Sequence, residues 1–180
     1  MRSALVVALT LVSGGAQADS EQAVSIGGGY ATFTAPGEQM GEMTPPQVSP
    51  TAGGALAASY ERAIGSDVAL RAELAGGLFF GGNAEGQSAT SYALLGDVGA
   101  VFRFDIFKYV PYAFAGVGGV AAWGGPIDRG ADFVLVIGGG LDRLWSRQHS
   151  AGIELRLASF GGDVTVVTIG LRGTRRWGFF

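Results

Sequence analysis

The stretch HSAGIELRLASFGG, residues 149–162, alternates between two kinds of side chain. Ile153, Leu155 and Leu157 occupy one parity, whereas Glu154 and Arg156 occupy the other. Successive side chains of a β-strand point to opposite faces, so the pattern predicts a strand with one aliphatic face and one face that carries an acid beside a base. A fold built from such strands must place the two faces in different environments.

Seven further segments show strand character, and turn residues separate them. The eight predicted strands are Ala23–Phe33, Ala55–Arg62, Val68–Phe80, Ser91–Phe104, Val110–Trp123, Asp132–Trp145, Ala151–Phe160 and Val164–Gly173. Most have about the nine to eleven residues that a tilted strand needs to cross a bilayer. The pattern does not reveal which face of the first and fifth strands points inward.

The connections between the predicted strands alternate in length. The first is long and contains four prolines, and the third and fifth are longer than the tight second, fourth and sixth. Only the seventh connection, GGD at residues 161–163, departs from this rhythm. Long loops at one end and tight turns at the other are typical of outer-membrane barrels, in which the turns face the periplasm.

Charged residues make up only 15% of the chain, against about a quarter in an ordinary soluble domain. The polar faces of the predicted strands carry mainly glycine, alanine and serine with a few charges of both signs, which does not suit a solvated surface. We therefore predict an all-β, eight-stranded, antiparallel up-and-down transmembrane barrel with its polar faces inside. A secreted soluble barrel of the lipocalin type is the alternative fold.

Eight charged residues share the predicted inward face. They are Arg71, Arg103, Arg156, Arg172, Glu73, Asp97, Asp142 and Glu154. Because unpaired ions in a narrow interior are costly, we expect these residues to form one connected ion-pair network that plugs the barrel. Arg172 is the first expected partner of Glu154, while Arg156 lies about 6.6 Å along the same strand, at the limit of a direct contact.

Aromatic residues near the strand ends are predicted on the apolar face. They are Tyr30, Tyr60, Phe80, Tyr92, Phe102, Phe104, Trp123, Trp145 and Phe160. Aromatic rings at the ends of lipid-facing strands are expected at the two membrane–water interfaces. The alternative is that these rings belong to an ordinary hydrophobic core.

The first 18 residues have the three parts of a secretory signal peptide. Arg2 precedes the apolar run Ala4–Val12, and Ala16-Gln17-Ala18 is a small-residue cleavage site. We expect residues 1–18 to be removed and residues 19–180 to form the barrel domain. Without Arg2, eleven basic residues remain against fifteen acidic ones, a net charge of −4. This balance argues against nucleic acid as a partner.

The C-terminal half resembles the small outer-membrane barrels of the outer membrane protein A, W and opacity-like group. The resemblance rests on YVPYAFAGVGGV at residues 109–120 and on the run from GGGLD at residues 138–142 to the end of the eighth predicted strand. Phe180 matches the group's terminal assembly signal, although Gly173–Arg176 interrupts the expected apolar alternation before it. The resemblance implies insertion by the barrel-assembly machinery into a Gram-negative outer membrane.

Catalytic and metal-binding motifs are weak in this sequence. His149 is the only histidine and there is no cysteine, so we expect no metal site and no cofactor. His149 and Ser150 are adjacent, and on a strand they point to opposite faces, where they cannot share a proton. The prediction is a non-enzymatic scaffold that presents extracellular loops to an unknown ligand. The alternatives are a barrel that binds or passes small hydrophobic molecules and a lipid-modifying enzyme.

Overall fold

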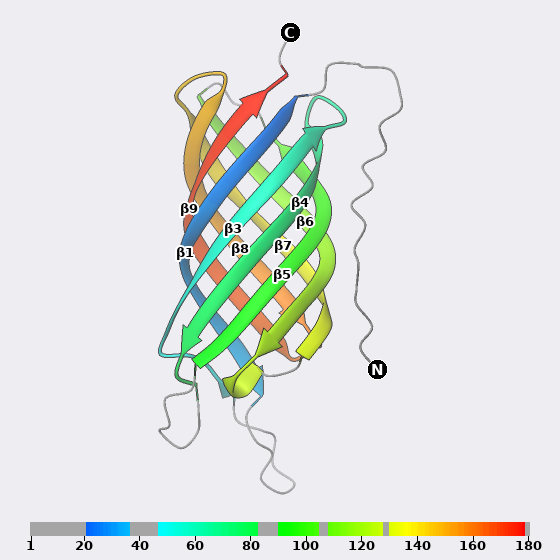
Figure 1. The fold of residues 1–180 in the computed structure, drawn as a ribbon. Helices are drawn as coiled ribbons and strands as arrows, with labels where there is room; N and C mark the ends of the chain where they lie inside the picture. The colour runs from blue at the N-terminus through cyan, green and yellow to red at the C-terminus, as the bar shows by residue number, and fades with distance from the viewer. Residues whose placement is uncertain (1–20, 37–46, 83–89, 105–107, 128–129, 179–180) are drawn as a thin grey trace, which may run out of the picture.

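The structure, a computed structural model, describes residues 21–36, 47–82, 90–104, 108–127 and 130–178. The predicted signal peptide and residues 37–46 of the proline-rich first connection lie outside these residues. The described chain forms a closed antiparallel barrel of eight strands, as predicted (Figure 1). No helix among the described residues is long and apolar enough to span a membrane.

The barrel strands are 12 to 15 residues long. They are β1 (Gln22–Pro36), β3 (Ala52–Ala63), β4 (Val68–Phe80), β5 (Thr90–Arg103), β6 (Tyr109–Trp123), β7 (Gly130–Leu144), β8 (His149–Phe160) and β9 (Val164–Trp177). A short β2 (Gln47–Val48) pairs with the last residues of β1, and the 3-10 turn η1 spans Gly125–Ile127. Each predicted strand corresponds to one barrel strand.

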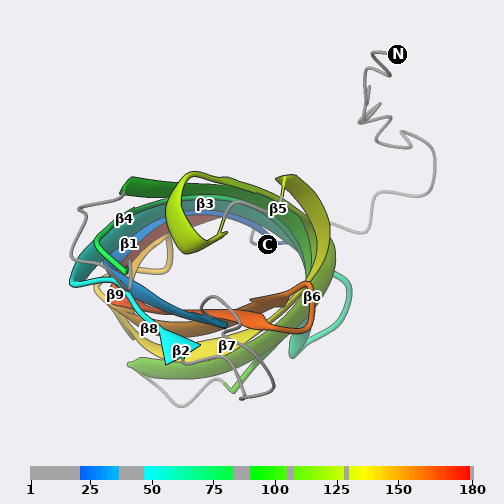
Figure 2. The same cartoon turned by 90° about the horizontal axis from the view of Figure 1, so that it is seen from below.

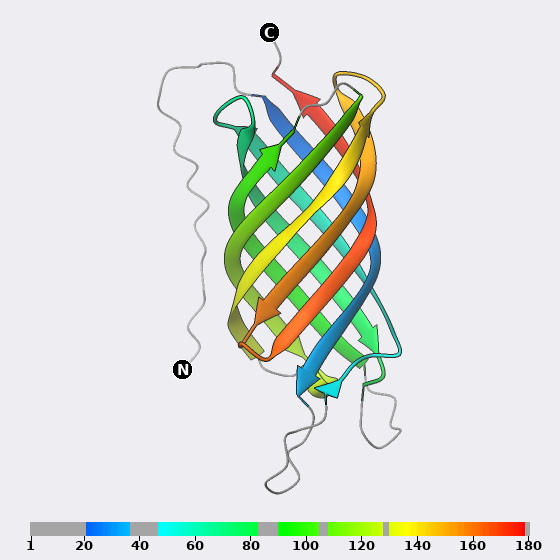
Figure 3. The same cartoon turned by 180° about the vertical axis from the view of Figure 1, so that it is seen from behind.

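The barrel closes because β1 pairs with both β3 and β9. Its residue Gln22 lies opposite Arg62 on β3 and opposite Trp177 on β9. All other barrel strands pair with their neighbours in the sequence (Figure 3). Closure satisfies the backbone hydrogen-bonding groups that an open sheet edge would leave unpaired in hydrocarbon.

The two ends of the barrel differ. We call the end that carries the turns at residues 64–67 and 145–148, together with Trp177, the turn end. The opposite end, which carries Pro36 and the turn at residues 161–163, is the loop end. In Figure 1 the turn end is at the top, beside the C-terminus. Gly161 and Gly162 both have positive φ angles, which explains how so short a turn forms at the loop end.

The two faces of the strands have the predicted orientation. Leu74, Leu155 and Leu171 are 59%, 49% and 70% exposed on the outer wall, whereas the neighbouring charged residues point inward. The structure also resolves the two strands that the sequence left open. Ile26 of β1 faces outward at 67% exposure, and Tyr112 of β6 is buried inside the barrel. An apolar outer wall around a polar interior is the arrangement expected in a bilayer.

The prediction that the last strand ends at Gly173 was wrong. Gly173–Arg176 does not interrupt β9, which continues to Trp177. Thr174 and Arg176 keep the inward parity of Arg172 and are both buried. The reason is that a strand needs only alternating orientation, and a polar interior accepts threonine and arginine as well as smaller residues.

Most of the aromatic residues predicted at the strand ends face outward. Tyr60 is partly exposed, and seven others are 42% to 69% exposed: Tyr30, Phe80, Tyr92, Phe102, Phe104, Trp123 and Trp145. Tyr92 and Trp123 stack with their ring centroids 5.8 Å apart. The prediction for Phe160 was wrong, because this residue is only 2% exposed and has the inward parity of Arg156.

Phe160 belongs to an apolar layer that fills the interior toward the loop end. We call this layer the apolar plug; its main members are Phe33, Phe79, Val120, Ile127, Val134, Phe160 and Val164. Phe33 and Phe79 meet edge to face at 5.3 Å, and Ile127 of η1 is completely buried. Figure 2 shows η1 at the mouth of the barrel, seen from the loop end. The sequence predicts a polar interior along the barrel. The apolar plug shows that the polar interior occupies only part of it.

The wall packs most closely where glycine residues face a neighbouring backbone. A Cβ atom on Gly99 of β5 would lie 2.0 Å from the carbonyl oxygen of Ala115 on β6. On Gly76 of β4 the nearest atom would be 3.9 Å away. A side chain at Gly99 is therefore expected to strain the wall, whereas one at Gly76 is not.

We predict that Gly99→Ala destabilises the barrel, because the added methyl group forces the backbones of β5 and β6 apart. Overpacking of this kind costs about 1–3 kcal/mol. The matched control is Gly76→Ala, which has room for the same group and is expected to unfold like the wild type. Urea unfolding in lipid vesicles measures both, and equal midpoints for the two variants would refute the prediction.

Candidate functional site

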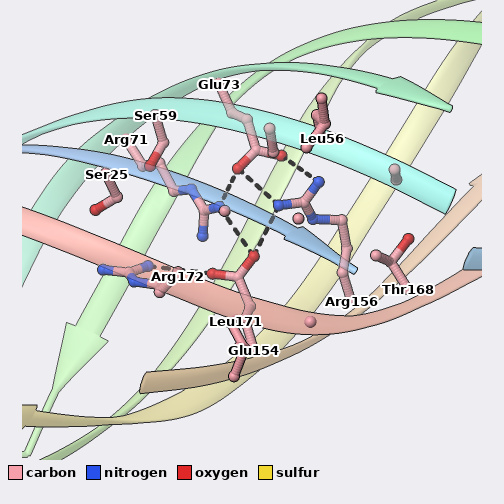
Figure 4. A pocket seen from close by; sticks show the side chains of 15 residues that line it. Ser25, Leu56, Ser59, Arg71, Glu73, Glu154, Arg156, Thr168, Leu171 and Arg172 are labelled. Carbon is pink, nitrogen blue, oxygen red and sulfur yellow. Dashed lines mark hydrogen bonds and ion pairs between the residues drawn. The ribbon is translucent and has the colours of Figure 1, made fainter. Parts of the chain in front are cut away.

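The candidate site is the charged interior between the apolar plug and the turn end. Arg71 and Glu73 project into it from β4, and Glu154 and Arg156 project from β8 on the other side of the barrel. In each strand the two residues are separated by one outward-facing position, so strand alternation places both charges inside. Figure 4 shows these four side chains meeting one another and Arg172 of β9.

Two carboxylates join three arginines at the centre of the site. Glu73 contacts Arg71 and lies 2.7 Å from Nη1 of Arg156. Glu154 lies 2.7 Å from Arg156, 3.1 Å from Arg172 and 3.6 Å from Arg71. The first expected partner of Glu154 is therefore present, and Arg156 on the same strand contacts it as well.

The ion pairs continue from this centre toward the turn end. Arg172 lies 3.3 Å from Glu61 and 3.5 Å from Asp142, and Glu61 also contacts Arg103.

Three further contacts close the chain of ion pairs. Glu21 lies 3.1 Å from Arg103 and 3.5 Å from Arg176, and Arg176 is 3.3 Å from Asp142. We call the whole set the interior network: Arg71, Arg103, Arg156, Arg172, Arg176, Glu21, Glu61, Glu73, Asp142 and Glu154. Its five positive and five negative side chains balance, as the burial of charge requires.

The structure brings seven of the eight predicted interior charges into this network. Asp97 is the exception: it is buried at 7% exposure, but no ion pair to it is found among the described residues. Its position explains the difference, because Asp97 lies opposite Glu73 in the pairing of β4 with β5. Two like charges in register repel each other, and the arginines contact Glu73 instead.

The sequence analysis missed three members of the network, Glu21, Glu61 and Arg176. Arg176 lay in the segment that was expected to break the last strand. Glu61 follows the alanine-rich start of β3, where the alternation is weak, but it shares the parity of the buried Ser59. Glu21 lies just before β1, outside any pattern that a strand could impose.

Aromatic rings from β6 cover two of the arginines. The guanidinium carbon of Arg71 lies 3.9 Å from the centroid of the Phe114 ring, and that of Arg172 lies 4.3 Å from the centroid of the Tyr112 ring. The hydroxyl of Tyr112 also donates a hydrogen bond to Glu154 at 3.0 Å. These cation–π contacts add attraction where water is scarce and fix the planes of the guanidinium groups.

The cavities found among the described residues inside the barrel are small. A cavity of about 30 Å³ lies among the charged residues, including Arg71, Glu73 and Glu154. A second cavity of about 40 Å³ separates Arg156 from the apolar residues Phe79 and Phe160. A larger pocket of about 200 Å³ opens at the turn end, beside Glu21, Arg103 and Arg147. The two inner cavities are each no larger than one or two water molecules.

His149 and Ser150 have the opposed orientations expected from their adjacency. His149 is exposed at the turn end, while Ser150 is 2% exposed and donates a hydrogen bond to Asp142 at 3.1 Å. Nδ1 of His149 instead lies 3.4 Å from Oγ of Ser146, which also accepts hydrogen bonds from the backbone N–H groups of Gln148 and His149. These contacts are those of a residue that closes a turn.

A metal site is not found in the described part of the chain. Among those residues, no group of three or more histidine, cysteine, aspartate or glutamate side chains could hold a metal ion. The acidic residues of the interior network are instead neutralised by arginine. What the site can do chemically is therefore to join the strands across the lumen and to occupy the lumen.

No protein-family model matches this sequence, and no curated protein matches it. Solved structures do share the fold. The attachment invasion locus protein Ail of Yersinia pestis is 17% identical with a TM-score of 0.57, covering 88% of this chain and 99% of its own. Neisserial surface protein A is 15% identical with a TM-score of 0.57, covering 88% and 97%.

An enzyme is also among the similar structures. The outer membrane enzyme PagL is 15% identical with a TM-score of 0.50, and the alignment covers 85% of this chain and 98% of PagL. At these identities the likeness concerns the fold alone. The chain thus has the fold of the small eight-stranded outer-membrane β-barrels.

Proposed function

We propose that this protein is a non-enzymatic integral protein of the Gram-negative outer membrane, a sealed barrel that holds loops outside the cell. The apolar outer wall and the fold shared with outer-membrane proteins support the location. Tight turns of such barrels face the periplasm, so the turn end is proposed to face inward and the loop end outward. The barrel-assembly machinery would insert the chain, with outer-membrane lipids around it.

The observation that carries this proposal is the filled lumen. The interior network crosses the barrel from β4 to β8 and β9, and the apolar plug fills the section between this network and the loop end. An eight-stranded barrel is just wide enough for its own side chains. Because the interior network and the apolar plug both fill the lumen, a rigid support for loops is favoured over a channel.

Planar-bilayer recording tests the sealed lumen. We expect the refolded barrel to show no large, stable conductance, because the two inner cavities measure only about 30 and 40 Å³. The heat-dependent gel mobility of the same sample shows that it is folded. A steady open level of porin size from folded protein would contradict the proposal.

The two other functions that the sequence left open find less support. A site for a small hydrophobic molecule needs about 300 Å³ or more, whereas the cavity beside the apolar plug measures about 40 Å³. For a lipid-modifying enzyme, a histidine must reach a nucleophile that substrate can also reach. Ser150 is buried against Asp142, on the face opposite His149.

A further inference from the structure

The outer wall at the turn end carries arginines among aromatic rings. Arg143 on β7 and Arg175 on β9 are exposed on the lipid-facing parity, in line with the exposed residues Leu141 and Leu171. We call the surrounding group the basic–aromatic patch: Tyr109, Arg143, Trp145, His149, Arg175 and Trp177.

The patch is continuous across neighbouring strands. Tyr109 of β6 lies opposite Arg143, and His149 of β8 lies opposite Arg175. Only β8 separates the two arginine-bearing strands, so their backbones are about 10 Å apart. Two long side chains at this separation can reach a single lipid headgroup from both sides.

The loop end differs in charge. Its described residues include the acidic Asp132 and Asp163 and, within the described ranges, no basic residue. Among the described residues, the cations on the outer wall thus lie at the end proposed to face the periplasm. Aromatic rings belong at either membrane interface, but the described cations of the wall lie at one end alone.

A guanidinium group on the outer wall requires an anion at the level of the lipid headgroups. Within the described residues the side chain of neither Arg143 nor Arg175 forms a hydrogen bond or an ion pair, in contrast to the five arginines of the interior network. The planar donor array of arginine matches a phosphate well. Trp145 and Trp177, 69% and 37% exposed, extend into the same layer, where indole rings favour the boundary of hydrocarbon and water.

We infer that the basic–aromatic patch binds the phosphate headgroup of an anionic phospholipid in the periplasmic leaflet, with Arg143 and Arg175 on either side of it. The inference rests on the proposed function, because the barrel wall must face lipid. Charge complementarity selects an anionic lipid over a zwitterionic one. The described residues of the loop end carry acidic groups and do not favour an anionic lipid there.

Tryptophan fluorescence provides the test, because the chain has three tryptophans and two of them lie in the patch. The full barrel domain is reconstituted into phosphatidylcholine vesicles that contain bromine-labelled phosphatidylglycerol or, for comparison, bromine-labelled phosphatidylcholine. In Trp123→Phe the signal comes from Trp145 and Trp177. In Trp145→Phe/Trp177→Phe it comes from Trp123 at the loop end.

We expect the patch tryptophans to prefer phosphatidylglycerol over phosphatidylcholine by at least about fivefold, since each surface arginine strengthens attraction to anionic lipid by about that factor. Arg143→Gln/Arg175→Gln, made in the Trp123→Phe background, is expected to remove the preference. Arg143→Lys/Arg175→Lys keeps the charge and is expected to retain part of it. Trp123 should show no preference.

The outcomes separate this inference from the proposed function. If labelled phosphatidylcholine quenches both sets of tryptophans but phosphatidylglycerol is not preferred at the patch, only the inference fails. It fails equally if the preference survives in the folded Arg143→Gln/Arg175→Gln variant. If neither lipid quenches any tryptophan of the folded wild type, the wall does not face lipid and the proposed function fails.

Discussion

Replacing Glu154 by alanine is expected to lower the free energy of unfolding by about 3–5 kcal/mol, because the change strands buried cations. Glu154 lies within 4 Å of three arginines, at 2.7 Å from Arg156, 3.1 Å from Arg172 and 3.6 Å from Arg71. Its removal also breaks the balance of five acids and five bases in the interior network. The loss is expected as a lower midpoint of urea unfolding in lipid vesicles.

The matched comparison is the double variant Glu154→Ala/Arg156→Ala. It removes one acid and one base, so the interior stays neutral, and Glu73 keeps its contact with Arg71. Arg172 likewise keeps Glu61 and Asp142. We therefore expect the double variant to be more stable than Glu154→Ala alone, although it has lost more contacts. A double variant that loses the sum of the two single effects would show that charge balance does not govern the interior.

Strand alternation made the overall fold predictable from sequence. Leu155 beside Glu154 and Arg156 identifies both faces of β8 without any knowledge of its neighbours. A closed barrel then follows, because no other arrangement pairs every strand of a sheet that is apolar outside. Where side chains are small, as in Ala55–Ser59 of β3, alternation carries little information, and Glu61 was missed for this reason.

The partners inside the barrel were less predictable than the residues themselves. Parity places Asp97 and Glu73 on the same inner surface, but only the register of β4 with β5 shows that they lie opposite each other. Register depends on the stagger of the whole barrel, which no single strand encodes. For the same reason Arg176 pairs with Asp142 of β7, although β8 lies between their strands.

The sequence analysis missed the apolar plug because it expected apolar side chains to face the lipid. Phe79 and Phe160 have the parity of the charged residues on their strands, so their inward positions could have been read from alternation alone. Phe33 lies on the first strand, whose inward face the sequence left open. A polar interior was expected along the whole barrel, yet the ion pairs occupy one section and aromatic packing occupies the other. The ion pairs seal one section of the narrow lumen by neutralised charge, and the apolar side chains seal the other by close packing.

The second large loss of stability is expected from a charge on the outer wall. Leu155→Arg is expected to destabilise the folded barrel by about 2–4 kcal/mol, the cost of arginine at the middle of a bilayer on the lipid face of a barrel. Leu155 is 49% exposed at the centre of β8, and its partner Ile169 on β9 is 55% exposed, so no nearby group can accept the charge. Leu155→Ala leaves an apolar surface and is expected to cost less.

The control for this expectation is an outward-facing position closer to the membrane surface. Phe80, 49% exposed at the loop end of β4, lies where a long side chain can reach the headgroups. Phe80→Arg is therefore expected to cost only about 0–1 kcal/mol. A spin label at position 155 should be relaxed by oxygen dissolved in lipid and protected from an aqueous quencher. Equal costs for the two arginine variants, together with aqueous access at position 155, would place Leu155 outside the bilayer and reverse the assignment of the outer wall.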